Sequence, residues 1–261
     1  MIGAMDYRHI GVAGEGEFAV ITMRRPEKRN ALSEEHLREL LHAFREAGEG
    51  KARGVILAAE GPVFSAGHDF DDMAERDLVA MRRLLLTCAE LMQAIQRIPQ
   101  PVIAQVEGLA TAAGCQLVAS CDLAVAGASA RFAVPGGRGG WFCTTPGVAL
   151  ARAVSRKRAL EMLLTGEPID AATAADWGLV NRVVPDPRVG EETRALLAAA
   201  TRGSSVSKGL GKQAFYRQVE LDLASAYAYA TELMAAASQI EDAREGLAAF
   251  REKRKPRFQD R

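Results

Sequence analysis

The most constraining feature of this 261-residue chain is an alternation of short buried strands with amphipathic helices between residues 54 and 125. Residues 54–59 and 102–106 are apolar runs of strand length. Between them, apolar side chains recur at helical spacing from residue 84 to 98, and two prolines at 99 and 101 end that pattern. A small-residue helix over 112–120 and a strand over 122–125 follow. Such an alternation predicts an α/β core.

The segment before this core predicts a hairpin and one helix. Residues 8–24 contain two short strands around the turn Gly14-Glu15-Gly16. The same residues match a dinucleotide-binding fingerprint, but β-branched residues follow them where that fingerprint requires a helix, so we interpret them as a hairpin. Ser33 has the side chain of a helix N-cap, and apolar residues at helical spacing predict a helix over about 34–48.

The segment after residue 147 predicts a mainly helical C-terminal half. Asp170 is a candidate helix cap, a short strand is expected near 180–184, and helices are expected to about residue 254. We therefore expect an α/β core over residues 1–195 and a helical region over 196–261. The helical region is too small for a full core of its own, so it must pack on the core or on another subunit.

Composition and charge exclude several classes of protein. The 33 basic and 33 acidic residues cancel, which argues against nucleic-acid binding through net charge. The uncharged stretch 108–121 is too short for a membrane span, and we expect no membrane partner. Residues 1–6 lack the pattern of a secretion signal, so a cytoplasmic location is expected. The four cysteines are scattered, which predicts free thiols and no metal site.

Four loops rich in glycine or alanine follow predicted strands, and they are the candidate functional segments. They cover residues 25–32, 64–70, 108–116 and 135–141. A strand that ends in small residues and opens a helix presents free backbone N–H groups, and these can hold an oxyanion. Two such loops could face one substrate oxygen.

The motifs in these loops resemble the crotonase superfamily, the enoyl-CoA hydratase/isomerase proteins. The resemblance rests on the order of several pieces: Arg25-Pro26 through Asn30-Ala31-Leu32, Ser65-Ala-Gly-x-Asp69, Gly108-x-Ala110 through Gly114-Cys115, Cys121-Asp122, and residues 165–169. The run Ala-Thr-Ala-Ala-Gly-Cys-Gln over 110–116 is typical of one branch of that family. The similarity extends over essentially the whole chain.

This resemblance implies a crotonase-like spiral of ββα units with a C-terminal helical trimerisation region, so that the protein is a homotrimer or a dimer of trimers. It implies an acyl-CoA thioester as partner, with coenzyme A as part of the substrate and no other cofactor. In the family two backbone N–H groups hold the thioester oxygen. Residue by residue, these donors fall on His68 and Ala113, where a family glycine is replaced by alanine.

The two glutamates of the family hydratases are missing from this chain. The first position falls on Gln116 and the second, after Pro135, on Gly136. An amide can position a water by hydrogen bonding but has no pKa in the range useful for acid–base catalysis, and glycine has no side chain. Each acid–base group contributes about 10²–10⁴-fold to a rate, so we expect hydration to be inefficient.

The remaining candidate residues lie in the same loops. We expect the His68 ring to face solvent or the CoA adenine, Gln116 to hold a water, and Arg138 to bind a substrate carboxylate. His9, His36 and His42 have the pattern of strand or helix-surface residues. The other expected substrate-binding residues, which contact CoA or line the acyl pocket beside Gln116 and Gly136, are Lys28, Arg29, Ala66, Gly67, Asp69, Trp141 and Phe142.

Two alternatives to a hydratase or isomerase stay open from the sequence. Decarboxylation of a malonyl- or methylmalonyl-type thioester needs an oxyanion hole and no strong base, and residues 65–69 and 253–257 resemble family members with that activity. The tyrosine that those members place in the acyl pocket falls near Phe142 here. A non-catalytic acyl-CoA binder would keep the hole without using acid–base chemistry.

Overall fold

The core of the molecule is a six-stranded mixed sheet, in a computed structural model that describes residues 6–261. The strand order is β1-β2-β3-β4-β6-β9, in which β1 and β2 form the expected antiparallel hairpin and every other pair is parallel. The strands are β1 (Ile10–Glu15), β2 (Phe18–Met23), β3 (Gly54–Ala59), β4 (Val102–Val106), β6 (Leu123–Gly127) and β9 (Arg182–Val184). The predicted α/β core is confirmed, and the predicted bounds of β3 and β4 match.

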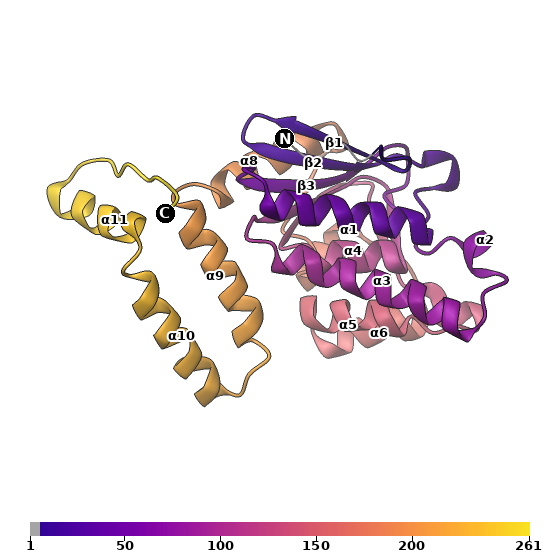
Figure 1. The fold of residues 1–261 in the computed structure, drawn as a ribbon. Helices are drawn as coiled ribbons and strands as arrows, with labels where there is room; N and C mark the ends of the chain where they lie inside the picture. The colour runs from indigo at the N-terminus through magenta and orange to yellow at the C-terminus, as the bar shows by residue number, and fades with distance from the viewer. Residues whose placement is uncertain (1–5) are drawn as a thin grey trace.

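Helices cover both faces of this sheet (Figure 1). On one face lie α1 (Glu34–Glu49), α3 (Leu78–Arg97) and α4 (Ala113–Ser120), and on the other lies α8 (Val189–Ala200). Because successive strand side chains point to opposite faces, Val55 and Leu57 pack into the larger core under α1 and α3. Ile56 packs with Val189 and Leu197 of α8 instead. Ser33 caps α1 by accepting from the His36 N–H, as predicted.

A second, three-stranded sheet was not predicted from the sequence. It has the order β5-β7-β8, formed by β5 (Leu109–Thr111), β7 (Arg131–Ala133) and β8 (Ile169–Asp170). Strands of two or three residues are too short to display a period, so the pattern could not reveal them. Their position matters for the site, because β5 leads directly into α4 and β7 leads into the loop 134–143.

The other helices complete the core and form a C-terminal arm. Asp170 caps α7 by accepting from the Thr173 N–H, as predicted. Within residues 6–261 no helix is both long and apolar enough to cross a membrane. These helices are α2 (Phe70–Met73), α5 (Thr144–Ala153), α6 (Arg156–Thr165), α7 (Ala171–Trp177), α9 (Ser205–Gln218), α10 (Leu223–Ala237) and α11 (Glu241–Glu252).

The C-terminal arm consists of α10 and α11, which lie beyond α9 and away from the sheet in Figure 1. Its large apolar side chains Leu223, Tyr227, Met234 and Phe250 are all at least 70% exposed. A helical region that packs outside its own core was expected, and the arm has this character. The expected division after residue 195 falls inside α8 and stays a prediction.

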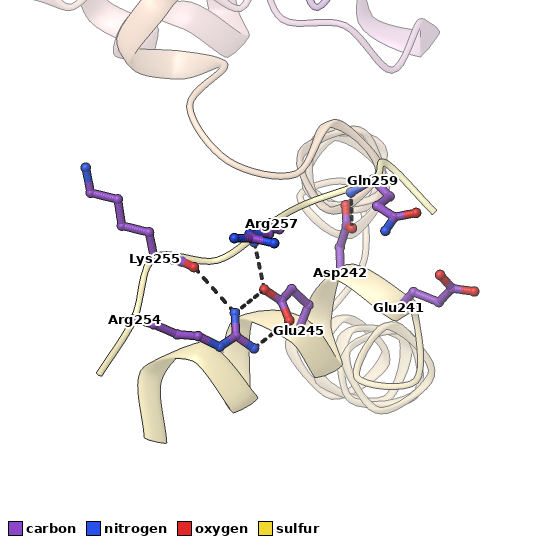
Figure 2. A pocket seen from close by; sticks show the side chains of 7 residues that line it. All are labelled: Glu241, Asp242, Glu245, Arg254, Lys255, Arg257 and Gln259. Atoms are coloured by element: carbon purple, nitrogen blue, oxygen red, sulfur yellow. Dashed lines mark hydrogen bonds and ion pairs between the residues drawn. The ribbon is translucent and has the colours of Figure 1, made fainter. Parts of the chain in front are cut away.

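The last residues of the chain fold back along α11. Asp242 accepts hydrogen bonds from the Gln259 and Asp260 N–H groups at 2.7 and 3.0 Å. Glu245 holds the Arg254 guanidinium through both carboxylate oxygens and accepts from the Arg257 N–H (Figure 2). These bonds lower the pKa of Glu245 to about 2. The basic tail is therefore ordered against its own helix.

The expectation of a helix-surface position is wrong for His36. His36 is fully buried under the sheet, where its Nδ1 lies 3.2 Å from the Ala31 carbonyl and burial lowers its pKa to about 4. His9 is also buried, with its Nε2 2.9 Å from a Glu35 carboxylate oxygen. His42 is half-buried and contacts the Tyr7 hydroxyl. The packing of α1 against the hairpin covers these rings, which a helix-surface pattern does not reveal.

Candidate active site

Two of the predicted loops lie side by side at the carboxyl ends of their strands. The Ser65 N–H donates to the Leu109 carbonyl at 3.1 Å, and the Thr111 N–H donates back to the Ser65 carbonyl at 2.9 Å. Both segments pass close enough that a Cβ on Gly67 would lie 3.2 Å from the Ala113 nitrogen. The structure therefore brings residues 65–68 and the start of α4 together, as two loops facing one substrate atom require.

Glycine is required at two positions of this contact. Gly67 has φ +86°, a conformation that other residues adopt only with strain. A Cβ on Gly114 would lie 2.4 Å from the Ser65 carbonyl oxygen, so α4 can approach the first loop only with glycine there. Ala66 is half-buried in the same turn, and its N–H donates to the Arg29 carbonyl at 3.0 Å.

The backbone N–H groups of His68 and Ala113 are both free of internal partners. Ala113 is the first residue of α4, whose N-terminus has no side-chain cap. On one side of His68, the Leu32 N–H donates to the Gly67 carbonyl and the Leu32 carbonyl accepts from the Asp69 N–H. Because successive N–H groups of an extended segment point to opposite sides, the His68 N–H points away from Leu32. It faces the side on which Ser65 pairs with Ala110. No acceptor for either N–H group is present in residues 6–261. This is the arrangement that an oxyanion hole needs.

The residue before Ala113 is held in a strained conformation. Ala112 has φ +51° and ψ −118°, and its N–H donates to the Ala133 carbonyl at 2.9 Å. A non-glycine residue in such a region costs of order 1–3 kcal/mol and persists only where the surroundings enforce it. The hydrogen bond from Ala112 to β7 and the packing of Gly67 on Ala112 enforce this conformation. They thereby fix the direction of the Ala113 N–H group.

Two residues of these loops carry buried polar atoms without a hydrogen-bond partner. Of the six side-chain atoms of this kind in the described residues, three are His68 Nδ1, His68 Nε2 and Thr111 Oγ1. The expectation that the His68 ring faces solvent is therefore wrong, because both ring nitrogens are covered. Burial lowers the pKa of His68, so the ring is neutral near pH 7. Buried polar groups are normally hydrogen-bonded, so each of these atoms is a position where a bound water could be held.

Gln116, at the position of the first family glutamate, is buried on α4 one turn after Ala113. Its Oε1 lies 4.0 Å from Cys88 Sγ on α3. Gln116 also borders a cavity of about 820 Å³ between α3, α4, α5 and α9, on which Met92 and Tyr216 lie as well. The cavity includes Gln116 but not the other four residues expected to line the acyl pocket, which are Gly136, Arg138, Trp141 and Phe142.

The position of the second family glutamate is sterically closed. A Cβ on Gly136 would lie 2.3 Å from the Trp141 carbonyl oxygen and 2.7 Å from Cys143 Sγ. The Trp141 N–H donates to the Gly136 carbonyl at 2.9 Å, which folds residues 136–141 into a closed turn. The second carboxylate is thus absent from the sequence, and the loop also fills the space that its side chain would need.

Gly136→Ala is expected to lower the free energy of unfolding by about 2 kcal/mol, because the new methyl group meets backbone that cannot rotate away. Chemical denaturation monitored by circular dichroism measures this loss. Gly139→Ala is the matched control, since a Cβ there meets nothing within 4 Å. Equal stability of the two variants would contradict the closed position.

The other residues of this loop point outward. Arg138 is exposed and its guanidinium lies 2.8 Å from the Glu167 carboxylate, so in this structure it has an internal partner in place of a substrate carboxylate. Trp141 and Phe142 are partly exposed, at 49% and 42%. Their predicted place in the acyl pocket stays a prediction.

The predicted CoA-contacting residues lie near the first loop and are partly engaged. Lys28 Nζ is 2.7 Å from Asp71, and both side chains are exposed. Arg29 is exposed, with φ +52°. Asp69 is buried, lies 2.6 Å from Arg25 Nη1 and caps α2 by accepting from the Asp71 N–H. Asp69 therefore supports the loop, and Arg25, which sequence reasoning missed, is the residue that holds it.

One cluster of possible metal ligands is present in residues 6–261, although none was expected. His9, Glu35 and Glu39 offer atoms within 4.8 Å of one another. Both Glu39 oxygens already accept backbone N–H groups, from Arg8 and His9. His9 pairs with Glu35, so the cluster is satisfied as an anchor between the hairpin and α1.

Comparison with solved structures defines the class of protein. The fold superposes on enoyl-CoA hydratase from Mycobacterium smegmatis with a TM-score of 0.93 at 47% identity, over 96% of this chain and 98% of that one. It superposes on human enoyl-CoA hydratase domain-containing protein 3 with a TM-score of 0.92 at 44% identity, over 96% and 100%. This is the crotonase fold, and the predicted fold class is confirmed.

The family follows from the sequence comparisons. Residues 14–261 match the model of the enoyl-CoA hydratase/isomerase family, and the chain belongs to this family. It is 47% identical to enoyl-CoA hydratase domain-containing protein 3 of Xenopus laevis, over 90% of this chain and 81% of that protein. It is 34% identical to 2,3-dehydroadipyl-CoA hydratase of Escherichia coli, over 96% and 98%. The similarity to domain-containing protein 3 confirms the branch that residues 110–116 indicate.

The expectation of a cytoplasmic location is contradicted by the same relatives. The frog, human and mouse proteins are named as mitochondrial. The cytoplasmic expectation is therefore withdrawn.

Proposed function

We propose that this protein is an acyl-CoA-processing enzyme that stabilises a thioester enolate between the N–H groups of His68 and Ala113. The observation that carries this proposal is the pair of unpartnered N–H groups on two loops in direct contact. Each donor is fixed by its neighbours, Ala113 by the strained Ala112 and His68 by the bridge to Leu32. Donors that are fixed before the reaction stabilise developing charge without a reorganisation cost. Coenzyme A enters as part of the substrate.

Efficient hydration is not the reaction that this site favours. Hydration needs one group to take a proton from water and another to deliver a proton to the α-carbon. The Gln116 amide neither gains nor loses a proton near neutral pH and so cannot act as a general acid or base, and the space beside Gly136 is filled by backbone. A reaction that forms the enolate without a carboxylate base fits better. Loss of CO2 from a malonyl- or methylmalonyl-type thioester is such a reaction and is our second candidate.

The assembly that we propose is a homotrimer or a dimer of trimers, joined through the C-terminal arm. The exposed apolar side chains of α10 support this proposal, because a contiguous apolar surface of this kind marks a protein interface. Burial of Leu223, Tyr227 and Met234 against another copy would remove them from water. Analytical ultracentrifugation measures the assembly directly.

Wild-type protein is expected to hydrate crotonyl-CoA slowly, and Gln116→Glu is expected to raise that rate by about tenfold or more, because it returns one acid–base group. Loss of the enone absorbance measures the rate. Gln96→Glu on α3 is the matched control, since Gln96 borders the same cavity from another wall. Fast hydration of crotonyl-CoA by the wild type would contradict the proposal that this site does not favour hydration. Release of CO2 from methylmalonyl-CoA tests the second candidate in parallel.

A further inference from the structure

The side-chain amide of Asn30 ties its own loop to the segment that leads into the loop 64–70. Asn30 is fully buried, and its Nδ2 donates to the Glu60 carbonyl at 2.9 Å and to the Val63 carbonyl at 2.8 Å. Its Oδ1 accepts from the Arg25 N–H at 2.9 Å. Both amide protons and the amide oxygen are therefore engaged with backbone groups from two separate parts of the chain.

The backbone of Asn30 adds two further hydrogen bonds and explains the residue type. Its φ of +51° lies in the left-handed region, which asparagine adopts more readily than most residues. Its carbonyl accepts from the Ser65 hydroxyl at 2.9 Å, and its N–H donates to the Arg25 carbonyl at 2.8 Å. An ionised aspartate would suit the same backbone but has no donors for the Glu60 and Val63 carbonyls. Asparagine meets both demands.

The hydrogen bond that sets the direction of the His68 N–H lies two residues beyond Asn30. The Leu32 N–H donates to the Gly67 carbonyl at 2.7 Å. That carbonyl and the His68 N–H belong to one planar trans peptide, so they point in opposite directions. A fixed Leu32 N–H therefore fixes the direction in which the His68 N–H points.

Both partners of this hydrogen bond depend on Asn30. Leu32 is fully buried and lies between Asn30 and the N-cap of α1. Gly67 follows Ser65 by two residues, and the Ser65 hydroxyl bonds to the Asn30 carbonyl. The Ala113 donor is held differently, through the strained residue before it and β7. A change at Asn30 should therefore disturb one donor and spare the other.

We propose that Asn30 is a positioning residue of the oxyanion hole, which holds Leu32 where its N–H orients the Gly67–His68 peptide. This inference rests on the proposed function. Asn30 acts through Leu32 and needs no contact with the acyl-CoA. Fixed donors stabilise a developing charge only while they stay aligned with it, so a small rotation of this peptide weakens one of the two donors.

The test measures the carbonyl stretching frequency of butanoyl-CoA, labelled with 13C at the thioester carbon, in its complex with the protein. Hydrogen bonds from the oxyanion hole polarise this carbonyl and lower its frequency, so the infrared shift reports donor alignment without turnover. Asn30→Gly removes the amide and permits the same positive φ. It should keep butanoyl-CoA affinity within about threefold and lose about half of the wild-type shift. With the substrate that the wild type processes fastest, kcat should fall by about 10–100-fold.

Gln100→Ala is the matched control, because it removes another buried amide, whose Nε2 donates to the Gly48 carbonyl at 3.4 Å. Gln100 precedes β4 and so lies at the edge of the sheet opposite the carboxyl ends that lead to the site. This variant should keep the wild-type shift and the wild-type kcat. A merely structural role for Asn30 predicts that Asn30→Gly is less stable but keeps the wild-type shift and the wild-type kcat per butanoyl-CoA binding site. That result would overturn the inference.

Asn30→Asp decides the matter if Asn30→Gly does not fold, because it keeps the side-chain volume and the acceptor for the Arg25 N–H and loses the two donors. A wild-type shift in Asn30→Asp would refute the positioning role and leave the proposed function standing. Failure of both variants to fold, while Gln100→Ala folds, would assign Asn30 to folding and also overturn the inference. If the wild type binds butanoyl-CoA without a carbonyl shift, or does not bind it, the proposed function fails and the inference falls with it.

Discussion

Ala113→Pro is expected to lower acyl-CoA turnover by about 10²–10³-fold while the fold persists. Proline removes the N–H group that opens α4, and loss of one oxyanion donor has this magnitude. The first position of a helix tolerates proline because its N–H has no partner inside the helix. Steady-state rates with the substrate that wild type processes fastest measure the loss, and far-ultraviolet circular dichroism checks the fold.

Arg156→Pro provides the matched control, because Arg156 is exposed and is the first residue of α6. It introduces the same residue at the same helix position away from the site, and its rate should stay at the wild-type value. A wild-type rate in Ala113→Pro would exclude Ala113 as a donor. Gly67→Pro is unsuitable for this purpose, since the φ of +86° at Gly67 is incompatible with a proline ring.

Lys212→Met is expected to lower the free energy of unfolding by about 3–5 kcal/mol, the loss typical of breaking a buried ion pair. Lys212 Nζ lies 2.7 Å from Asp122 and donates to the Ile95 and Gln100 carbonyls at 2.9 and 2.8 Å. All three ammonium protons therefore have acceptors in the core. Burial lowers the pKa of Lys212 and raises that of Asp122, so each charge depends on the other.

Denaturant titration measures this loss, and Lys208→Met on the same helix is the control, because Lys208 is exposed. In the double variant Lys212→Met, Asp122→Asn the uncompensated carboxylate is gone, while the amide oxygen can still accept from the Val102 N–H. Part of the stability should return. Equal stability of Lys212→Met and Lys208→Met would show that α9 is held by other contacts.

The sequence was sufficient for the elements whose pattern is local. The cap at Ser33 and the apolar spacing placed α1 within about one residue, and the apolar runs placed β3 and β4. The motif loops also met as predicted, since parallel strands bring their carboxyl ends to one edge. The small sheet escaped detection because β8 has two residues and its partners three.

The parts of the site that the sequence did not reveal depend on contacts between distant residues or on a closed turn. The pairing of Arg25 with Asp69 spans 44 positions, and nothing near either residue indicates it. The closure at Gly136 depends on the path of residues 137–143, where three more glycines allow many turns.

The closed turn at Gly136 also constrains how this protein can change over evolutionary time. A codon change that introduces glutamate there would produce a chain that clashes with the Trp141 backbone, so selection would meet a folding defect before any gain in activity. The loop would have to be rebuilt first, by insertion or deletion between residues 137 and 142. The turn therefore keeps single substitutions from introducing a carboxylate at position 136, and it confines further adaptation to chemistry that does not need one there.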